Sequence, residues 1–305
     1  MRRLRTVMQA ALGLALGLVV AGTAWAAPPT PLLWKLAKGH STVYLLGSMH
    51  MLKDTDYPLS ADVENAYHDA QKLVFEIPPA EMDSPATLAL AMKYGVYMDA
   101  GHKLQDDIKP KEWEDVRAYV AKGGLSEFAL QRFRPWMAAI TIVEMESMKM
   151  GLKPDSGLDK HFMELAKADH KQTGGFETVD QQLSIFYTMT PAEQEDMLRQ
   201  TLEELPDFQK EMNEQHDTWR RGDAAAMMAQ AMKEFAKHPA LYQKLVAQRN
   251  RNWIPQIEKL LAEPGKDTLV IVGALHLGGN DGVVHLLQQK GYKVERVCTG
   301  CTNIH

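Results

Sequence analysis

The first apolar pattern of the mature part of the chain is a short strand that ends at a histidine. The β-branched and aromatic run 42–46 leads into Gly47-Ser48-Met49-His50, and a polar loop follows. Ser60 then precedes apolar positions spaced i, i+3, i+4 and i+7, which is the spacing of one buried helical face. An apolar strand over 73–77, stopped by Pro78-Pro79, completes a strand, helix, strand unit.

A second unit with the same order lies at the other end of the chain. The apolar run 268–272 leads into Gly273-Ala274-Leu275-His276, and a glycine-rich loop precedes a helix over 283–290. Gly291 is a natural C-cap for this helix, and 292–297 is the predicted returning strand. This order is typical of a right-handed βαβ crossover, so we interpret the two units as an internal pseudo-repeat.

The middle of the chain, from about 84 to 263, has residues typical of helix starts and ends in nearly every segment, and few strand signals. Pro110 is placed for a first helical turn, and Thr190-Pro191-Ala192-Glu193 has capping-box spacing. The sequence therefore predicts an α/β fold whose sheet is built from the N- and C-terminal units, with a large helical insertion forming a cap. The expected organisation is a signal peptide over 1–26 and a single domain over 27–305.

The amino terminus has the three parts of a secretory signal peptide. Three arginines within the first five residues precede an apolar run over 10–22, and Ala24-Trp25-Ala26 follows as a cleavage motif. The apolar run is shorter than the ~20 residues that a membrane-spanning helix needs. We expect cleavage after Ala26, a periplasmic or secreted protein, and no stable membrane insertion after cleavage.

The charge of the chain limits its expected partners, and its two cysteines predict a disulfide. The whole chain has a net charge of −5, and the leader holds basic residues but no acidic one, so the remainder is more acidic still. An acidic surface argues against nucleic acid and anionic lipid as partners. Cys298 and Cys301 are the only cysteines, and in an oxidising compartment such a close pair is expected to form a small disulfide loop.

A histidine follows each of the two repeated strand ends. Gly-x-x-His at the end of a strand delivers an imidazole beyond the carboxyl edge of the sheet, where open α/β sheets bind ligands. One such histidine is more often a core or capping residue than a ligand. Two in equivalent positions, His50 and His276, favour a site, because the sheet brings them to the same edge.

Three acidic residues are candidates to complete this site. Glu76 lies near the end of an otherwise apolar strand, where a carboxylate must be paired, hydrogen-bonded or near solvent. A surface charge at the strand end is the alternative for Glu76. Glu177 and Asp159 each lie at a predicted helix start, where capping or the helix dipole alone can account for an acidic residue.

The mature chain resembles the TraB/GumN family over essentially its whole length. The similar blocks, in the order of the family, are Tyr44-Leu45-Leu46-Gly47-Ser48-Met49-His50, Val74-Phe75-Glu76-Ile77, Gly157-Leu158-Asp159, Glu177-Thr178, Arg249-Asn250 and Val272-Gly273-Ala274-Leu275-His276-Leu277. The resemblance implies a fold shared with Tiki-type proteases, which are metal-dependent and cleave a secreted signalling protein, and more distantly with erythromycin esterases. It also implies that His50, His276 and Glu76 are principal site residues, and that Glu177 and Arg249 line the cleft.

The residues leave two enzymatic versions open. With a divalent metal ion, His50 and His276 plus a carboxylate of Glu76 or Glu177 form a mixed nitrogen and oxygen site whose open position activates water. Without an ion, one histidine is the general base and a glutamate orients it. We expect an exported hydrolase of the peptidase or esterase type, which is metal-dependent in the first version. Its expected catalytic groups are His50, His276, Glu76 and Glu177.

A non-catalytic periplasmic protein is the alternative from another class. Such a protein uses the acidic, methionine-rich insertion to bind a peptide or a signal molecule. In either class, Arg249, Asn250 and Asp159 are expected to contact the peptide or small-molecule substrate. Converging histidine side chains favour the enzyme, and diverging ones favour the binding protein.

Overall fold

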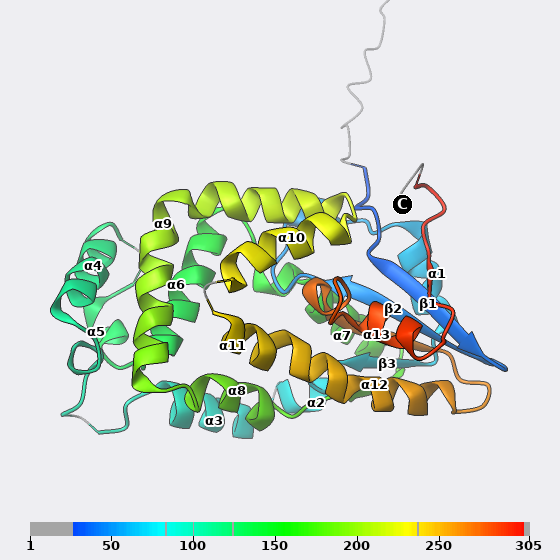
Figure 1. The fold of residues 1–305 in the computed structure, drawn as a ribbon, viewed down its shortest axis with the longest axis horizontal. Coiled ribbons are helices and arrows are strands. Elements are labelled where there is room, and N and C mark those ends of the chain that lie inside the picture. The colour runs from blue at the N-terminus through cyan, green and yellow to red at the C-terminus, as the bar shows by residue number, and fades with distance from the viewer. Residues whose placement is uncertain (1–26, 83, 100, 124, 237, 302–305) are drawn as a thin grey trace, which may run out of the picture.

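The computed structural model describes residues 27–301, except 83, 100, 124 and 237. The expected signal peptide, 1–26, lies outside the described residues. A sheet with its covering helices forms one end of the molecule, and a group of helices forms the other (Figure 1).

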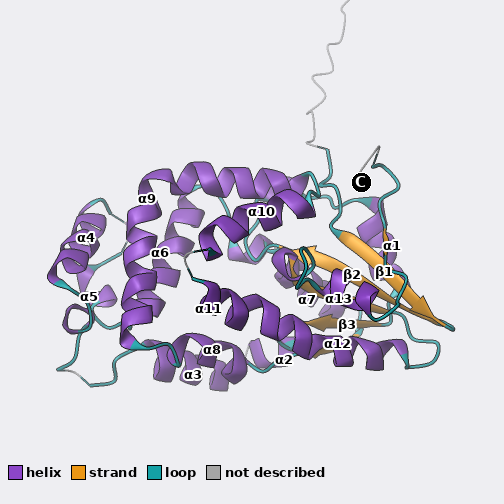
Figure 2. Cartoon of the chain, in the orientation of Figure 1, coloured by secondary structure: helices purple, strands orange, loops and turns teal. Residues whose placement is uncertain are grey.

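A six-stranded sheet has the order β4-β3-β5-β2-β1-β6 (Figure 2). Its strands are β1 (Leu33–Lys38), β2 (Ser41–Ser48), β3 (Lys72–Phe75), β4 (Gln172–Gly175), β5 (Thr268–Gly273) and β6 (Glu295–Arg296). The first four strands in this order run parallel, whereas β1 pairs antiparallel with both β2 and β6. The predicted α/β fold, with both ends of the chain in one sheet, is confirmed.

The two predicted units are interleaved in the sheet. Strand β5 lies between β2 and β3, and β2 and β1 together separate β5 from β6. The returning strand expected over 292–297 is only two residues long, Glu295–Arg296. Each unit is therefore a crossover between parallel strands that are not neighbours.

Two strands were not predicted, β1 and β4. Strand β4 has the sequence Gln-Thr-Gly-Gly and lies inside the stretch expected to be helical. It pairs with β3 up to Phe75 and Gly175. A Cβ on Gly175 would lie 2.4 Å from Pro78, so the close approach of two backbones selects glycine here. The insertion 84–263 is consequently not continuous, because β4 belongs to the sheet.

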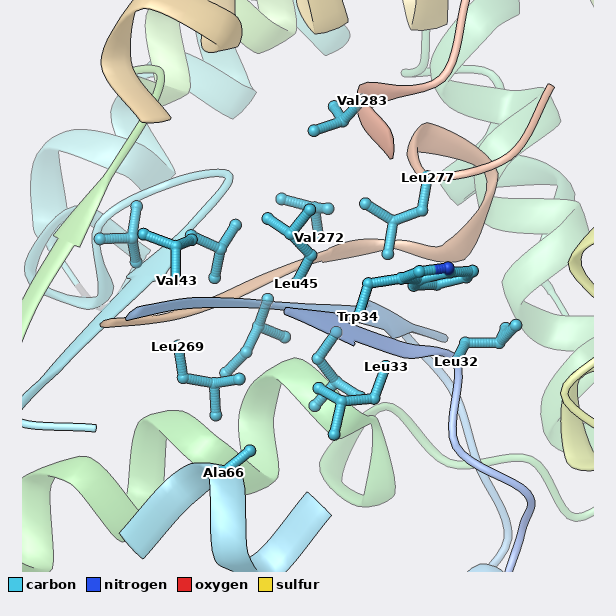
Figure 3. Close-up of a cluster of buried hydrophobic side chains, with 14 of the residues drawn as sticks. Leu32, Leu33, Trp34, Val43, Leu45, Ala66, Leu269, Val272, Leu277 and Val283 are labelled. Carbon is cyan, nitrogen blue, oxygen red and sulfur yellow. The ribbon is translucent and has the colours of Figure 1, made fainter. Parts of the chain in front are cut away.

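Helices cover both faces of the sheet. They are α1 (Ala61–Asp69) and α7 (Leu158–Ala168) on one face, and α12 (Gln248–Leu261) and α13 (Val283–Gln289) on the other. Leu33 and Leu269 point toward Ala66 of α1, whereas Val272 points the other way, toward Val283 (Figure 3). This alternation buries both faces of the strands in one hydrophobic core.

The remaining helices lie beside the sheet, and a second hydrophobic cluster forms among some of them. They are α2 (Pro79–Met82), α3 (Pro85–Gly95), α4 (Pro110–Ala121), α5 (Glu127–Leu130), α6 (Pro135–Lys149), α8 (Val179–Tyr187), α9 (Pro191–Arg220), α10 (Ala224–Phe235) and α11 (Pro239–Tyr242). Ile142 of α6 and Leu198 of α9 are fully buried in this cluster. As predicted, Pro110 begins α4, and Thr190 and Glu193 form a capping box on α9.

Two further expectations concern the termini and the membrane. Within residues 27–301, where the structure describes them, no helix is long and apolar enough to cross a bilayer. Cys298 and Cys301 form the predicted disulfide, with Cα atoms 5.5 Å apart.

Candidate functional site

Four parallel strands end at one edge of the sheet, and a predicted site residue follows each of them. In the sheet order β4, β3, β5, β2, these residues are Glu177, Glu76, His276 and His50. Ser48 and Gly273 form the last pair between β2 and β5, so both histidines follow a shared strand end. This edge is where open α/β sheets bind their ligands.

A buried arginine of α12 connects three of these side chains. The guanidinium of Arg249 donates from Nη2 to Oε2 of Glu76 at 2.5 Å, and from Nε to both carboxylate oxygens of Glu177 at 3.1 and 2.9 Å. Its Nη1 lies 3.1 Å from Nε2 of His276 and donates to the carbonyl of Leu245 at 3.0 Å. Charge-assisted hydrogen bonds of this kind are about twice as strong as neutral ones. Arg249 is therefore the centre of the buried part of the site.

Hydrogen bonds at both ring nitrogens determine the tautomer of His276. Asn250 donates from Nδ2 to the carbonyl of Asp281 at 2.7 Å, so its Oδ1 is the acceptor that faces Nδ1 of His276 at 2.6 Å. The proton of His276 therefore lies on Nδ1, and the lone pair of Nε2 accepts from Arg249. Burial, together with the Arg249 charge, lowers the pKa of His276 to about 4, so the imidazole is neutral at pH 7.

The carboxylate of Glu76 accepts hydrogen bonds at both of its oxygens. The Gly273 N–H donates to Oε1 at 2.8 Å, and Gln182 joins Arg249 at Oε2 with a distance of 3.1 Å. Burial alone raises the pKa of this carboxyl. The charges of Arg249 and His50 and the Gly273 N–H outweigh burial and hold the pKa of Glu76 well below its usual range. Glu76 is therefore ionised, and the surface-charge alternative does not apply.

Glu177 shares the same arginine from the neighbouring strand. Its backbone N–H donates to the carbonyl of Glu76 at 2.9 Å, which fixes the end of β4 against the end of β3. The indole of Trp253 donates to its Oε1 at 2.9 Å. Burial raises the pKa of Glu177, and the Arg249 charge only partly opposes this effect. Thr178 and Gln181 form the predicted capping box directly after it.

His50 differs from His276 because it faces solvent. Its side chain is 70% exposed, and its Nδ1 donates to Oδ2 of Asp159 at 2.8 Å. The hydroxyl of Ser48 donates to the other oxygen of Asp159 at 2.9 Å. Asp159 lies in the first turn of α7, directly after Gly157-Leu158. A Cβ on Gly157 would lie 2.1 Å from the carbonyl oxygen of His50, so glycine is needed for this approach.

The Asp159 carboxylate raises the pKa of His50 above its ordinary value. Asp159→Asn should therefore lower the pKa of His50 by about 1 unit or more, because the neighbouring negative charge is removed. An NMR titration of the imidazole resonances measures this change. Asp115→Asn, on the distant helix α4, is the control and should leave His50 unchanged. Equal His50 titration curves in the wild type and Asp159→Asn would contradict the pairing.

The predicted metal ligands have hydrogen-bonded lone pairs in this arrangement. Nε2 of His276 faces a guanidinium donor, and both oxygens of Glu76 accept from N–H groups. In the described part of the chain, no group of three or more His, Cys, Asp or Glu side chains is placed to hold a metal ion. A divalent ion between His50, His276 and Glu76 therefore does not fit unless Arg249 moves. The divalent metal ion expected from the sequence stays a prediction.

The three residues expected to contact the substrate form hydrogen bonds with other residues of the site. Asp159 holds His50, Asn250 holds His276, and Arg249 joins the two glutamates. Arg249 and Glu177 also line a hollow of about 570 Å³ between α8 and α12. Its other polar walls include the amide side chains of Gln181, Gln243, Gln248, Asn252 and Gln256.

Trp253 is a site residue that the sequence reasoning missed. Its ring centroid lies 4.4 Å from that of His276, and the Arg249 guanidinium lies 5.0 Å from the Trp253 ring centroid. Trp253 follows Arg249 by four positions on α12, which places both on the same helical face. That spacing is the signal that could have found it. Ser48 and Gln182 were missed as well.

Comparisons with known proteins place the chain in a protein family. The uncharacterized protein YbaP of Escherichia coli K12 is 23% identical over 250 residues, which cover 82% of this chain and 89% of that protein. The protein of the same name from Shigella flexneri matches equally. No solved structure matches. The sequence model of the TraB/PrgY/gumN family matches residues 32–296, a range that includes every residue of the site, and the chain therefore belongs to the TraB/PrgY/gumN family.

Proposed function

We propose that this protein is a hydrolase in which His50 is the general base. The observation that carries the proposal is the pair of His50 and Asp159 at the ligand-binding edge of the sheet. A carboxylate orients one ring nitrogen, and no hydrogen bond among the described residues uses the other, Nε2. A histidine held in this way can exchange a proton with water, as histidines do in hydrolases. Asp159 thus takes the orienting role that we expected of a glutamate.

In the proposed reaction, Nε2 of His50 removes a proton from water as the water oxygen attacks the carbonyl carbon of a peptide or ester. The protonated imidazole then returns that proton to the leaving group when the tetrahedral intermediate collapses. Asp159 stabilises the imidazolium that forms between these steps. Since only the neutral imidazole accepts a proton, activity should rise with pH through the raised pKa of His50.

Hydrolysis by the mature protein, residues 27–305, tests this proposal. A panel of nitrophenyl esters and fluorogenic peptides is assayed between pH 6 and 10, with and without EDTA. We expect turnover that EDTA does not change and that rises with pH. Loss of activity in EDTA, with recovery on adding a divalent ion, would instead favour the metal-dependent version.

A non-catalytic binding protein is the second candidate, and the hollow between α8 and α12 favours it. Five amide side chains along its walls can both donate to and accept from a peptide main chain. Binding of peptides by a folded protein that hydrolyses no substrate of the panel would support this candidate.

A further inference from the structure

Three acceptor groups from three different elements converge on the guanidinium of Arg249. Glu76 follows β3, Glu177 follows β4, and His276 ends the short helix Ala274–His276 after β5. Their acceptor atoms lie 2.5 to 3.1 Å from the nitrogens of Arg249. Two carboxylates and one neutral imidazole nitrogen are also a ligand set that Zn²⁺ or Mn²⁺ accepts.

These acceptors need a positive charge between them. The four side chains are only 7% to 11% exposed, so water screens the two carboxylates poorly. Each unpaired buried charge costs several kcal/mol. The guanidinium removes that cost by giving charge and N–H donors to both glutamates at once. A metal ion can compensate the same charges, but it cannot share the space with the guanidinium.

Further contacts hold the guanidinium in this space. Its Nη1 donates to the carbonyl of Leu245, one turn earlier in the chain, and its plane lies near the ring of Trp253. Trp253 in turn donates to Glu177, so tryptophan, arginine and carboxylate restrain one another. Arg249 is therefore an integral part of the site and not a mobile side chain that lies over it.

We infer that Arg249 is the resident cation of this site, in the place that a divalent ion would otherwise take. The wild-type protein accordingly binds no divalent ion at these acceptors. As they stand, Glu76, Glu177 and His276 are not placed to hold a metal ion, but removing the guanidinium lets these three side chains close around one Zn²⁺ or Mn²⁺ ion as its ligands. This inference does not depend on whether the protein is a hydrolase.

Metal uptake by Arg249→Met in the full mature protein tests the inference. The variant is stripped of metal, then titrated with Zn²⁺ and Mn²⁺ by calorimetry, and bound metal is measured by mass spectrometry after dialysis. We expect one equivalent to bind at least ~100-fold more tightly than any ion binds to the wild type. Arg251→Met is the matched control on the same helix, because Arg251 is exposed and pairs with Asp281, and it should behave as the wild type.

Two more variants separate the outcomes. Adding Glu76→Gln to Arg249→Met should abolish the tight binding, which identifies the acceptors as ligands. If Arg249→Met does not fold without metal, Arg249→Met with Glu177→Gln removes the charge repulsion and should still bind one ion, more weakly. The inference is overturned if the wild type binds one ion in a way that Glu76→Gln abolishes. A folded Arg249→Met variant, or its Glu177→Gln derivative, that takes up no ion would overturn it as well.

Discussion

Arg249→Met should lower the free energy of unfolding of the metal-free protein by roughly 3–5 kcal/mol. The reason is that one guanidinium compensates two buried carboxylates and donates to a neutral imidazole, so its loss leaves both carboxylates without their cation and Nε2 of His276 without its donor. Equilibrium unfolding in urea at pH 7, followed by circular dichroism, measures the change.

Two controls assign this loss to the buried charges. Arg251→Met removes an exposed arginine two positions away on α12 and should change the free energy of unfolding by less than ~1 kcal/mol. Glu76→Gln and Glu177→Gln, added to Arg249→Met, remove the uncompensated charges and should restore part of the lost stability. A loss below ~1 kcal/mol in Arg249→Met itself would mean that water or rearrangement compensates the carboxylates.

His50→Ala should lower kcat/KM about 10²- to 10⁴-fold on any substrate that the wild type hydrolyses. The fold should persist, because the His50 side chain is 70% exposed and contributes little to the core. Steady-state kinetics together with a thermal unfolding curve separates lost chemistry from lost structure. His68→Ala, an exposed histidine of α1, is the control and should keep full activity. Unchanged kinetics in His50→Ala would remove His50 from the reaction.

The sequence predicts those parts of the fold whose signal is local. β2 and β5 each contain a continuous apolar run that leads into a glycine, so their positions could be inferred from the local sequence pattern. β4 could not, because it has no large apolar residue and forms through pairing with β3 and the close approach of Gly175 to Pro78. The length of β6 was overestimated, because only Glu295 and Arg296 pair with β1.

The strand-end residues of the candidate site were predictable from the sequence, but the pairings that hold them were not. His50 and His276 follow strand ends, and parallel strands must end at the same edge. The partners come from α7 and α12, whose positions depend on side chains such as Phe162 and Trp253 that pack in the sheet core. No local pattern shows that Asp159 reaches His50.

The interleaved strand order also limits when this chain can fold. Strand β5, one of the two inner strands of the four that run parallel, comes from Thr268–Gly273, close to the end of the chain, whereas its neighbours β2 and β3 come from the first quarter. Strand pairs so distant in sequence form slowly, because a long loop must close before the contacts stabilise it. Until the last tenth or so of the chain is available, β2 and β3 have no strand between them, and the edge that carries the site does not exist. When such a chain passes through a narrow channel amino terminus first, its sheet therefore cannot form on the far side until β5 has emerged.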